Sequence, residues 1–293
     1  MSPKQQFEKV CAIVVGFYPE EIALSRMFDE LSGVVGKIYF IDNTPSEEIY
    51  TSFRSGTNID IIYLRNNYGI AYAQNVGIKK AIKEKFSYAL LLDQDSTIHS
   101  GLVINLICSL DELSKKYCDI ACIGPRIFDQ LEEVVERSND EEIFDTGYSL
   151  SKQIIASGTL LNLSNIEHIG MMDEDLFIDA VDHEWCWRAI AKGYKVVIDD
   201  NVKMTHMIGI SRHGIGRWQY IICAPVRHYY QFRNTIILIQ REYVPIKWKI
   251  KKVSEIFISP LLFLFFGPDR LVRLKYMTKG IIAGIFKRMG RYS

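Results

Sequence analysis

The first half of the chain alternates short, continuous apolar runs with segments of helical periodicity. The apolar runs have the length expected of strands that are buried on both faces. They are Val10–Phe17, Ile38–Ile41, Ile59–Leu64, Tyr88–Leu92 and Ile120–Ile123. Glu20–Leu31 and Ala71–Lys85 lie between them and carry apolar residues at helical spacing. Strands that alternate with helices predict an α/β fold with a mostly parallel, Rossmann-like, doubly wound sheet.

The pattern changes in the second half. The segment 132–144 is acidic and loop-like, and 153–163 is either a strand or the start of an insert on the acceptor side. Asp182–Lys192 has the pattern of a helix, and Gly193 suits its C-terminal end. Tyr194–Ile198 then predicts a further strand.

The C-terminal tail is both apolar and basic. Ile256–Phe266 is an apolar run of 11 residues that contains Pro260, whereas a bilayer span needs about 20 apolar residues. Eleven Lys or Arg residues against Glu255 and Asp269 give residues 246–293 a charge of +9; since the chain is neutral, residues 1–245 carry −9.

Two interpretations of this tail remain open. The segment is a helix at a membrane surface, where each basic residue near anionic lipid contributes about 1 kcal/mol, or it is a helical cap whose lysines are solvated. We therefore expect a catalytic domain over residues 1–240 and a helical tail over residues 241–293.

Composition narrows the class of protein. With 293 residues, of which 48% are apolar and 24% charged, the chain is an ordinary globular protein. Its zero net charge argues against a nucleic-acid partner. Six cysteines without a CxxC pair and a polar start, MSPKQQFEKV, favour a cytoplasmic protein with reduced thiols.

The sharpest chemical signal is Asp93-Gln94-Asp95, which follows the apolar run 88–92 directly. In open α/β sheets, ligands bind beyond the carboxyl ends of the strands. At such a place, two carboxylates separated by one residue can bind Mg²⁺ or Mn²⁺, and substrate phosphates can provide the other ligands of the ion. The alternative is a polar turn with an Asp helix cap.

A second signal runs from Asn66 to Gly77, where small residues and asparagines recur at the start of a predicted helix. Small residues let a ligand approach the backbone, and asparagine pairs with polar ligand edges. Asn67, Gly69 and Asn75 are the donor-binding candidates in this segment. A close contact between helix and sheet would favour the same composition.

An acidic cluster precedes and opens the helix at 182–192. Asp182 lies near the N-terminus of this helix, where the helix dipole stabilises an anion. It is therefore a candidate general base, and the alternative is that it only caps the helix. Glu184 points elsewhere on a helix, which argues against a second metal pair.

Two basic side chains further along are also candidates. His206 follows the strand at 194–198, and neutral imidazole is a good metal ligand, although a lone histidine is more often structural. Arg233 has a planar guanidinium that suits a phosphate.

Together these motifs resemble family 2 glycosyltransferases with the GT-A fold, and most closely the bacterial rhamnosyltransferases that build O-antigen and capsule. The similarity extends over about residues 9–240, and its pieces occur in the expected order. They are GFYP after the first strand, Ile41-Asp42-Asn43, NNYGIAYAQNVG, LLLDQDS, EDLFIDAVDHEWCWRA, THMIG and YYQFRN.

The resemblance implies a site. Asp42 and Asn43 would lie beside the nucleotide base of a dTDP-sugar, and Asp93 and Asp95 would form the DxD motif that faces ribose, metal and diphosphate. His206 would be the third ligand of the Mg²⁺ or Mn²⁺ ion. Asp182 would be the catalytic base, although Val181 stands where the family has Glu; Asp179, nearby, would supply some of the missing acidity.

The resemblance also implies a reaction, the inverting transfer of rhamnose from dTDP-L-rhamnose to a saccharide acceptor carried on polyprenyl diphosphate. The enzyme would be peripheral at the inner face of the plasma membrane, through residues 246–293. No QxxRW motif occurs, which favours one sugar per turnover. A transferase for galactofuranose, glucose or N-acetylglucosamine and a non-catalytic nucleotide-sugar-binding scaffold remain as alternatives. The acceptor groove is expected around residues 126–160.

Overall fold

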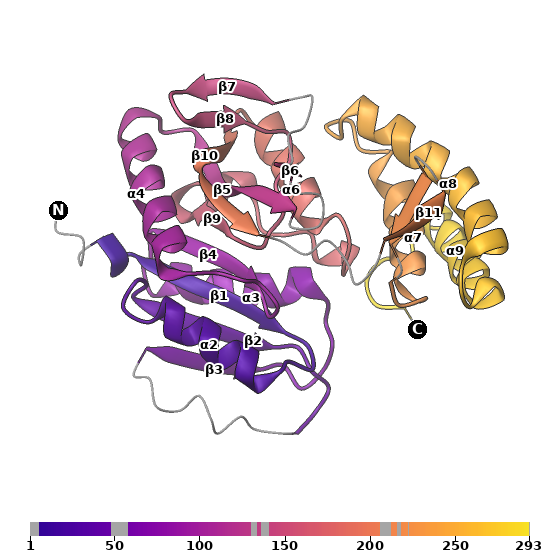
Figure 1. The fold of residues 1–293 in the computed structure, drawn as a ribbon, viewed down its shortest axis with the longest axis horizontal. Coiled ribbons are helices and arrows are strands. Elements are labelled where there is room, and N and C mark those ends of the chain that lie inside the picture. Colours follow the sequence, from indigo (N-terminus) through magenta and orange to yellow (C-terminus); the bar gives the residue numbers. More distant parts are fainter. Residues whose placement is uncertain are drawn as a thin grey trace.

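The computed structural model describes residues 6–47, 58–129, 134–135, 141–205, 212–215, 218–221 and 223–292. A large sheet forms its centre, with strand order β3-β2-β1-β4-β9-β5-β10-β8-β7 and with β6 paired to β5 (Figure 1). The parallel half contains β1 (Val10–Gly16), β2 (Lys37–Asp42), β3 (Ile59–Tyr63) and β4 (Tyr88–Asp93). The predicted α/β fold is confirmed.

The strands of this half are buried on both faces, as their continuous apolar composition predicts. Alternate residues of β1 point to opposite faces, so Ala12 packs with α2 (Glu21–Leu31) and α4 (Ser100–Lys116). Ile13 packs on the other face with α3 (Ile70–Lys83) and α6 (Val181–Ala191). The chain has to cross over between parallel strands, and α2 and α3 are these crossovers.

The second half of the sheet is mixed in direction. The strands β5 (Ile120–Asp129) and β10 (Lys195–Thr205) are parallel to each other. Between β4 and β5 lies β9 (Thr159–Asn162), which is antiparallel to both. The short strands β6 (Val134–Val135), β7 (Glu142–Asp145) and β8 (Tyr148–Leu150) add further antiparallel pairs. The sheet is thus parallel through its first half only, because β9 enters the middle in the opposite direction.

Short elements complete this part of the chain. They are the 3₁₀ turns η1 (Leu163–Asn165) and η2 (Glu174–Leu176), the helix α5 (Ile166–Ile169) and a separate hairpin of β11 (Arg212–Ile215) and β12 (Trp218–Ile221).

Three helices form a bundle beside the sheet (Figure 1). They are α7 (Arg227–Leu238), α8 (Ile246–Phe266) and α9 (Arg270–Ile285). Phe232, Phe263 and Met277 form a small core between them. The backbones of α7 and α9 approach closely at Gly280, where an added Cβ would lie 2.4 Å from the carbonyl oxygen of Tyr229. The domain boundary at residue 240 stays a prediction, although α7 packs with the two helices that follow it.

The predicted apolar segment 256–266 is the second half of α8, which continues through Pro260. Among the residues that the structure describes, no helix is long and apolar enough to cross a membrane.

Candidate functional site

The ends of three neighbouring parallel strands define one edge of the sheet. Gly16, the last residue of β1, pairs with Asp42 of β2, and Val15 pairs with Asp93 of β4. Because parallel strands end on the same side of a sheet, Asp42 and Asp93 lie on either side of β1 at this edge. The structure thus brings together two motifs whose aspartates, Asp42 and Asp93, are 51 positions apart in the sequence.

The loops beyond this edge are joined by hydrogen bonds. Buried Asn43 donates through Nδ2 to Asn67 Oδ1 at 3.2 Å and accepts the backbone N–H of Tyr68 at 2.9 Å. Asn67 Oδ1 also accepts the backbone N–H of Gly69 at 3.0 Å. Asp42 Oδ1 caps the backbone N–H of Thr44 at 3.0 Å. The residues predicted to surround the nucleotide are therefore adjacent and held in fixed positions.

The turn after β4 is closed by Ser96. Its Oγ accepts the backbone N–H of Asp93 at 3.0 Å and bonds Ser157 Oγ in the loop before β9. Gln94 points the other way, and its Oε1 accepts the backbone N–H of Phe17 at 2.5 Å. This turn is therefore tied to the loop before β9 through Ser157 and to the residue after β1 through Phe17.

Asp93 lies among other carboxylates. Burial, and then the charges of Asp95 and Asp182, raise the pKa of Asp93 to about 6, and Arg227 opposes this shift. The DxD acids and the predicted base are thus close enough to repel one another. A cluster of negative charge with one nearby arginine suits a positively charged ligand.

Asp182 is the second residue of α6, and Ala180 is the N-cap, so Asp182 is not a capping residue. Its Oδ2 accepts the backbone N–H of Ala156 at 3.2 Å, and its Oδ1 accepts that of His183 at 2.8 Å. The carboxylate lies in the first turn of α6, at the positive end of the helix dipole. The side chain is half-buried and held in place, as a proton acceptor requires.

The donor set at this edge fits a hard divalent cation. Two carboxylates, Asp93 and Asp95, are the oxygen ligands that Mg²⁺ and Mn²⁺ prefer, with substrate phosphates completing the shell. Within the described part of the chain, no three His, Cys, Asp or Glu side chains form a metal site. His206, the predicted third ligand, lies outside the described residues.

A strained segment leads into α6. Phe177, Asp179 and Ala180 all have positive φ, at 64°, 69° and 64°, which costs a non-glycine residue about 1–3 kcal/mol. Asn234 of α7 holds this segment, because its Nδ2 lies 3.0, 2.8 and 2.9 Å from the carbonyl oxygens of Leu176, Ile178 and Asp179. The orientation of Asp179 and Asp182 therefore depends on a side chain of the helical bundle.

Arg233, predicted to bind the donor, is fully buried. Its guanidinium donates to the carbonyl oxygens of Asp175, Leu176 and Gly290 and to Asn234 Oδ1. These contacts join α7, η2 and the C-terminus, so its observed role is to hold backbone segments together.

Arg227, which sequence reasoning missed, lies much nearer to the carboxylates. It forms a two-bond ion pair with Asp179. Burial lowers the pKa of the Arg227 guanidinium, but the negative charge of Asp179 outweighs burial, so the pKa is raised. Asp93 makes a smaller contribution in the same direction. The only hint in the sequence is its position just before the motif at 229–234, which is too weak to select it from 35 Lys and Arg residues.

Other candidates have structural contacts. Asn75 exchanges hydrogen bonds with the backbone of Met172, both at 2.9 Å, and its Nδ2 donates to Glu174. Gly69, at φ 88°, has the carbonyl oxygen of Phe177 only 2.4 Å from where a Cβ would lie. Both residues therefore pack α3 against the 172–177 segment.

Glu184 faces away from Asp182, as predicted. It is buried and pairs with Arg188 at 2.8 Å, with Arg241 at 3.1 Å and with the hydroxyl of Tyr243 at 2.6 Å. Trp185, the next residue of the same helix, is also buried, and its Nε1 donates to the carbonyl oxygen of Gly170 at 2.9 Å.

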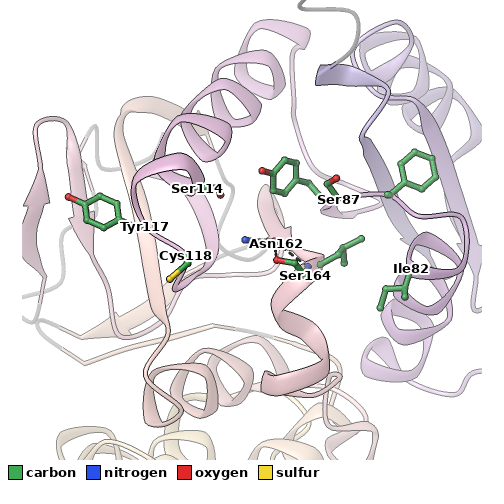
Figure 2. A pocket seen from close by; sticks show the side chains of 10 residues that line it. Ile82, Ser87, Ser114, Tyr117, Cys118, Asn162 and Ser164 are labelled. Carbon is green, nitrogen blue, oxygen red and sulfur yellow. Dashed lines mark hydrogen bonds between the residues drawn. The ribbon is translucent and has the colours of Figure 1, made fainter. Parts of the chain in front are cut away.

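A pocket of about 490 Å³ opens at the opposite end of β4. Figure 2 shows Ser114, Tyr117 and Cys118 on one side of it and Asn162 and Ser164 on another. It lies at the amino end of β4, beside Tyr88, and its lining residues include no charged side chain. This pocket is therefore separate from the carboxylate cluster.

Comparison with known proteins agrees with this geometry, although no protein-family model matches the chain. Over 289 residues the chain is 29% identical to the dTDP-rhamnosyl transferase RfbF of Shigella flexneri, a match that covers 94% of this chain and 93% of that protein.

Solved structures share the fold. A crystal structure of GalNAc-T7 with UDP, GalNAc and Mn²⁺ has a TM-score of 0.55 at 12% identity, covering 88% of this chain and 58% of that one. S. aureus TarS 1–349 has a TM-score of 0.53 at 12% identity, covering 95% and 81%. The complex of TarS 1–349 with UDP has a TM-score of 0.50 at 13% identity, covering 89% and 73%.

Proposed function

Since the chain is a glycosyltransferase with the GT-A fold, we propose that it moves rhamnose from dTDP-L-rhamnose to a saccharide acceptor, with inversion at the anomeric carbon. The choice of rhamnose is supported by the match to a dTDP-rhamnosyl transferase over nearly the full length of both chains. The acceptor is a lipid-linked saccharide of a cell-surface polysaccharide.

The observation that carries the proposal is the cluster of Asp93, Asp95 and Asp182 at the end of β4 and the start of α6. Asp93 and Asp95 face the donor diphosphate, and Asp182 faces the acceptor. Asp182 takes the proton of the acceptor hydroxyl while that oxygen attacks the anomeric carbon and the nucleoside diphosphate leaves from the opposite side. One base and one displacement give inversion.

Asp93 and Asp95 hold Mg²⁺ or Mn²⁺ in this proposal, with His206 as the third ligand. The divalent cation, when bound, neutralises charge that develops on the departing diphosphate. Burial, and then the charges of Asp95 and Asp182, raise the pKa of Asp93, so these carboxylates would favour a positive charge between them. Arg227 adds a fixed positive charge near Asp93, which favours the same leaving group.

The nucleotide lies beyond β1 and β2 in this proposal. Asp42 and Asn43 provide polar groups beside the base, and the bonds from Asn43 to Asn67 and Tyr68 keep the loop in place. Gly69 and Asn75 contribute indirectly, by fixing α3 against the 172–177 segment.

Calorimetry of donor binding tests the proposal. We expect dTDP-L-rhamnose to bind in the presence of Mn²⁺ and more tightly than UDP-glucose, UDP-galactofuranose or UDP-N-acetylglucosamine. The double variant Asp93→Ala/Asp95→Ala should lose this binding. The matched control Asp119→Ala/Asp145→Ala removes two carboxylates that pair with surface lysines and should keep it.

Each other outcome has a clear meaning. Tighter binding of a UDP-sugar would retain the fold and mechanism but reject rhamnose. A wild-type protein that binds none of the four nucleotide sugars would reject the enzyme and favour a scaffold.

We also propose that the outer face of α8 contacts an anionic membrane surface. Ile250, Phe257, Leu261 and Phe265 are between 57% and 70% exposed and recur along one side of the helix. The excess positive charge of residues 246–293 complements anionic lipid.

A further inference from the structure

The segment that follows α9 returns to the side of the bundle that faces the sheet (Figure 1). Residues 288–292 of this segment are here called the strap, and residues 66–69, which lead into α3, the donor loop. Arg291 of the strap and Asn66 of the donor loop are 225 positions apart in the sequence and are joined by a hydrogen bond. The strap therefore connects the helical bundle with a loop at the carboxyl edge of the sheet.

The strap is anchored at Gly290, just before it reaches the donor loop. The backbone N–H of Gly290 donates to the carbonyl oxygen of Asp175 at 2.9 Å, and its carbonyl oxygen accepts a hydrogen bond from Arg233 Nη1. Arg233 is fully buried and also donates to the carbonyl oxygen of Leu176 at 2.7 Å. A buried guanidinium that loses a partner is costly, so the position of Gly290 is fixed by the interior of the protein.

A second anchor lies at Tyr292, on the other side of Arg291. The backbone N–H of Tyr292 donates to the hydroxyl of Tyr230 at 3.0 Å, and its own hydroxyl accepts Lys279 Nζ at 2.6 Å. Its ring packs on that of Tyr229 at a centroid distance of 4.6 Å. The residues before and after Arg291 are thus both attached to the bundle, which limits where the guanidinium can lie.

Arg291 reaches the donor loop through a chain of hydrogen bonds. Its Nη1 donates to Asn66 Oδ1 at 2.6 Å, and the same oxygen accepts the backbone N–H of Asn67 at 2.9 Å. Asn67 Oδ1 in turn accepts Asn43 Nδ2 and the backbone N–H of Gly69. The chain therefore runs from the strap to Asn43, which is predicted to lie beside the nucleotide base.

Phe177 gives the strap and the donor loop a common support. Its carbonyl oxygen accepts the backbone N–H of Ile70, directly after the donor loop, at 2.8 Å. Its ring stacks on that of Tyr230 at a centroid distance of 4.8 Å and an interplanar angle of 10°. Because the hydroxyl of Tyr230 holds the strap at Tyr292, both segments are packed against the same pair of rings.

We propose that the strap positions the donor loop and that Arg291 is the positioning residue. A hydrogen bond from a charged guanidinium is about twice as strong as one between neutral groups, so Arg291 fixes the side chain of Asn66 and, through it, Asn67. The polar groups of the loop are then in place before the nucleotide binds, which lowers the cost of ordering them. The assignment rests on the proposed function, because it treats the donor loop as part of the nucleotide site.

Calorimetry with dTDP and Mn²⁺ tests the assignment. Arg291→Ala removes the contact, Asn66→Ala removes its acceptor, and a double variant carries both changes. The charge-matched control is Arg288→Ala, because Arg288 is an exposed residue of the same strap whose guanidinium lies over the ring of Phe286, 5.8 Å from its centroid.

We expect Arg291→Ala to bind dTDP at least fivefold more weakly than the wild type, and Arg288→Ala to stay within twofold. In the Asn66→Ala background, the further change Arg291→Ala should have no effect, because the contact is already lost. The midpoint of urea unfolding should be the same in Arg291→Ala and Arg288→Ala, since both side chains are exposed.

Three results of this experiment would overturn the assignment. They are an unchanged dTDP affinity in Arg291→Ala, an equal loss in Arg288→Ala, and the same loss from Arg291→Ala with or without Asn66. The last result would mean that Arg291 contacts the nucleotide directly rather than through the loop.

Hydrogen exchange in the ligand-free protein separates this proposal from the one on which it rests. The backbone amides of Tyr68 and Gly69 donate to asparagine side chains at 2.9 and 3.0 Å. Their exchange, measured by NMR, should be at least fivefold faster in Arg291→Ala than in the wild type and unchanged in Arg288→Ala. Unchanged exchange in Arg291→Ala would show that the strap does not hold the loop. If the wild type binds neither dTDP nor a nucleotide sugar, the proposed function fails, and the exchange result still decides whether the strap positions the loop.

Discussion

The edge of the sheet and the helical bundle differ in how their side chains act. At the edge, Asp42 and Asp93 each lie at the end of a strand, and their positions follow from β1, β2 and β4. In the bundle, Arg233 and Asn234 reach the backbone of residues 175–179, in a distant part of the sequence. The edge of the sheet thus supplies carboxylates directly. The bundle instead fixes the backbone of residues 175–179, which precedes Asp182.

Carboxylates at the sheet edge and on α6 also differ in how their charges are compensated. Buried Glu184 has three partners, Arg188, Arg241 and Tyr243, so its charge is satisfied within the protein. Asp93 instead has two carboxylates as neighbours and a raised pKa. A buried charge that is paired belongs to the structure, whereas carboxylates that repel one another indicate where a cation or a proton is to be bound.

The largest effect is expected at Asp182, where the two regions meet. Asp182→Asn removes the proton acceptor but keeps the size of the side chain, so kcat should fall by about 10²–10⁴-fold. Donor affinity, measured by calorimetry, should stay within twofold. The control Asp175→Asn changes an exposed carboxylate of η2 and should retain full activity; an equal loss there would reject the special role of Asp182.

The next effect tests whether the bundle positions the site. Asn234→Ala removes the side chain that holds the carbonyl groups of Leu176, Ile178 and Asp179. We expect kcat to fall about tenfold or more with an unchanged donor KM, and the free energy of unfolding to fall by about 1–3 kcal/mol. Gln240→Ala, at the exposed end of the same helical region, should change neither quantity.

A loss of stability in Asn234→Ala with normal kcat would show that the amide supports only the fold. Steady-state kinetics and urea unfolding on the same preparations distinguish these results.

A smaller effect, on stability, concerns the charge cluster. The pKa of Asp93 is raised to about 6, whereas an unfolded Asp titrates near 4. The native state therefore keeps a proton that the unfolded state has lost, so this group's contribution to stability decreases as the pH rises from about 4 through 6. Asp93→Asn should stabilise the metal-free protein by about 1–2 kcal/mol at pH 7 while abolishing activity.

Asp111 provides the opposite control in the same unfolding experiment. Burial raises the pKa of Asp111, but hydrogen bonds from Lys115 and Gln6 outweigh burial and lower it. Asp111→Asn should therefore reduce stability at pH 7. If Asp93→Asn and Asp111→Asn shift the free energy of unfolding in the same direction, the opposite pKa shifts inferred for Asp93 and Asp111 are wrong.

The smallest effect on the protein itself is expected on the outer face of α8. Phe257→Ser/Phe265→Ser changes two side chains that are 70% and 63% exposed, so the free energy of unfolding should change by less than about 0.5 kcal/mol per site. Sedimentation with anionic vesicles should nevertheless show weaker binding. Ile22→Ser/Ile143→Ser, on exposed residues outside the bundle, should sediment as the wild type does, and unchanged sedimentation of the α8 variant would leave α8 as a cap.

Several elements were predictable because their signal is local. The strands β1, β2, β3 and β4 coincide with continuous apolar runs. The helix α6 ends at Ala191, and Gly193 follows its C-cap Lys192 with φ 87°. The helix α4 has a local signal too, because Leu102, Val103, Leu106, Ile107 and Leu110 recur at helical spacing and are buried.

The direction of the strands and their order in the sheet could not be predicted from local patterns. Nothing in the four residues of β9 shows that they enter between β4 and β5 in the opposite direction. The acceptor groove was expected around residues 126–160, and that expectation stays untested. Among the described residues of this range, only Gln153 lines the cavity of about 810 Å³ that Ala180 and His183 also line.

The sequence by itself determined the α/β class, the order of the motifs and the pair of acids at the end of β4, because each of these depends on residues that are neighbours in the chain. Only the tertiary structure decided that Arg227 faces Asp179, that Arg233 and Asn234 hold backbone carbonyls, and that α8 closes a cavity next to Asp182. Every residue has a carbonyl group, so a hydrogen bond to one leaves no pattern in the sequence. Such contacts become visible only when folding brings distant segments together.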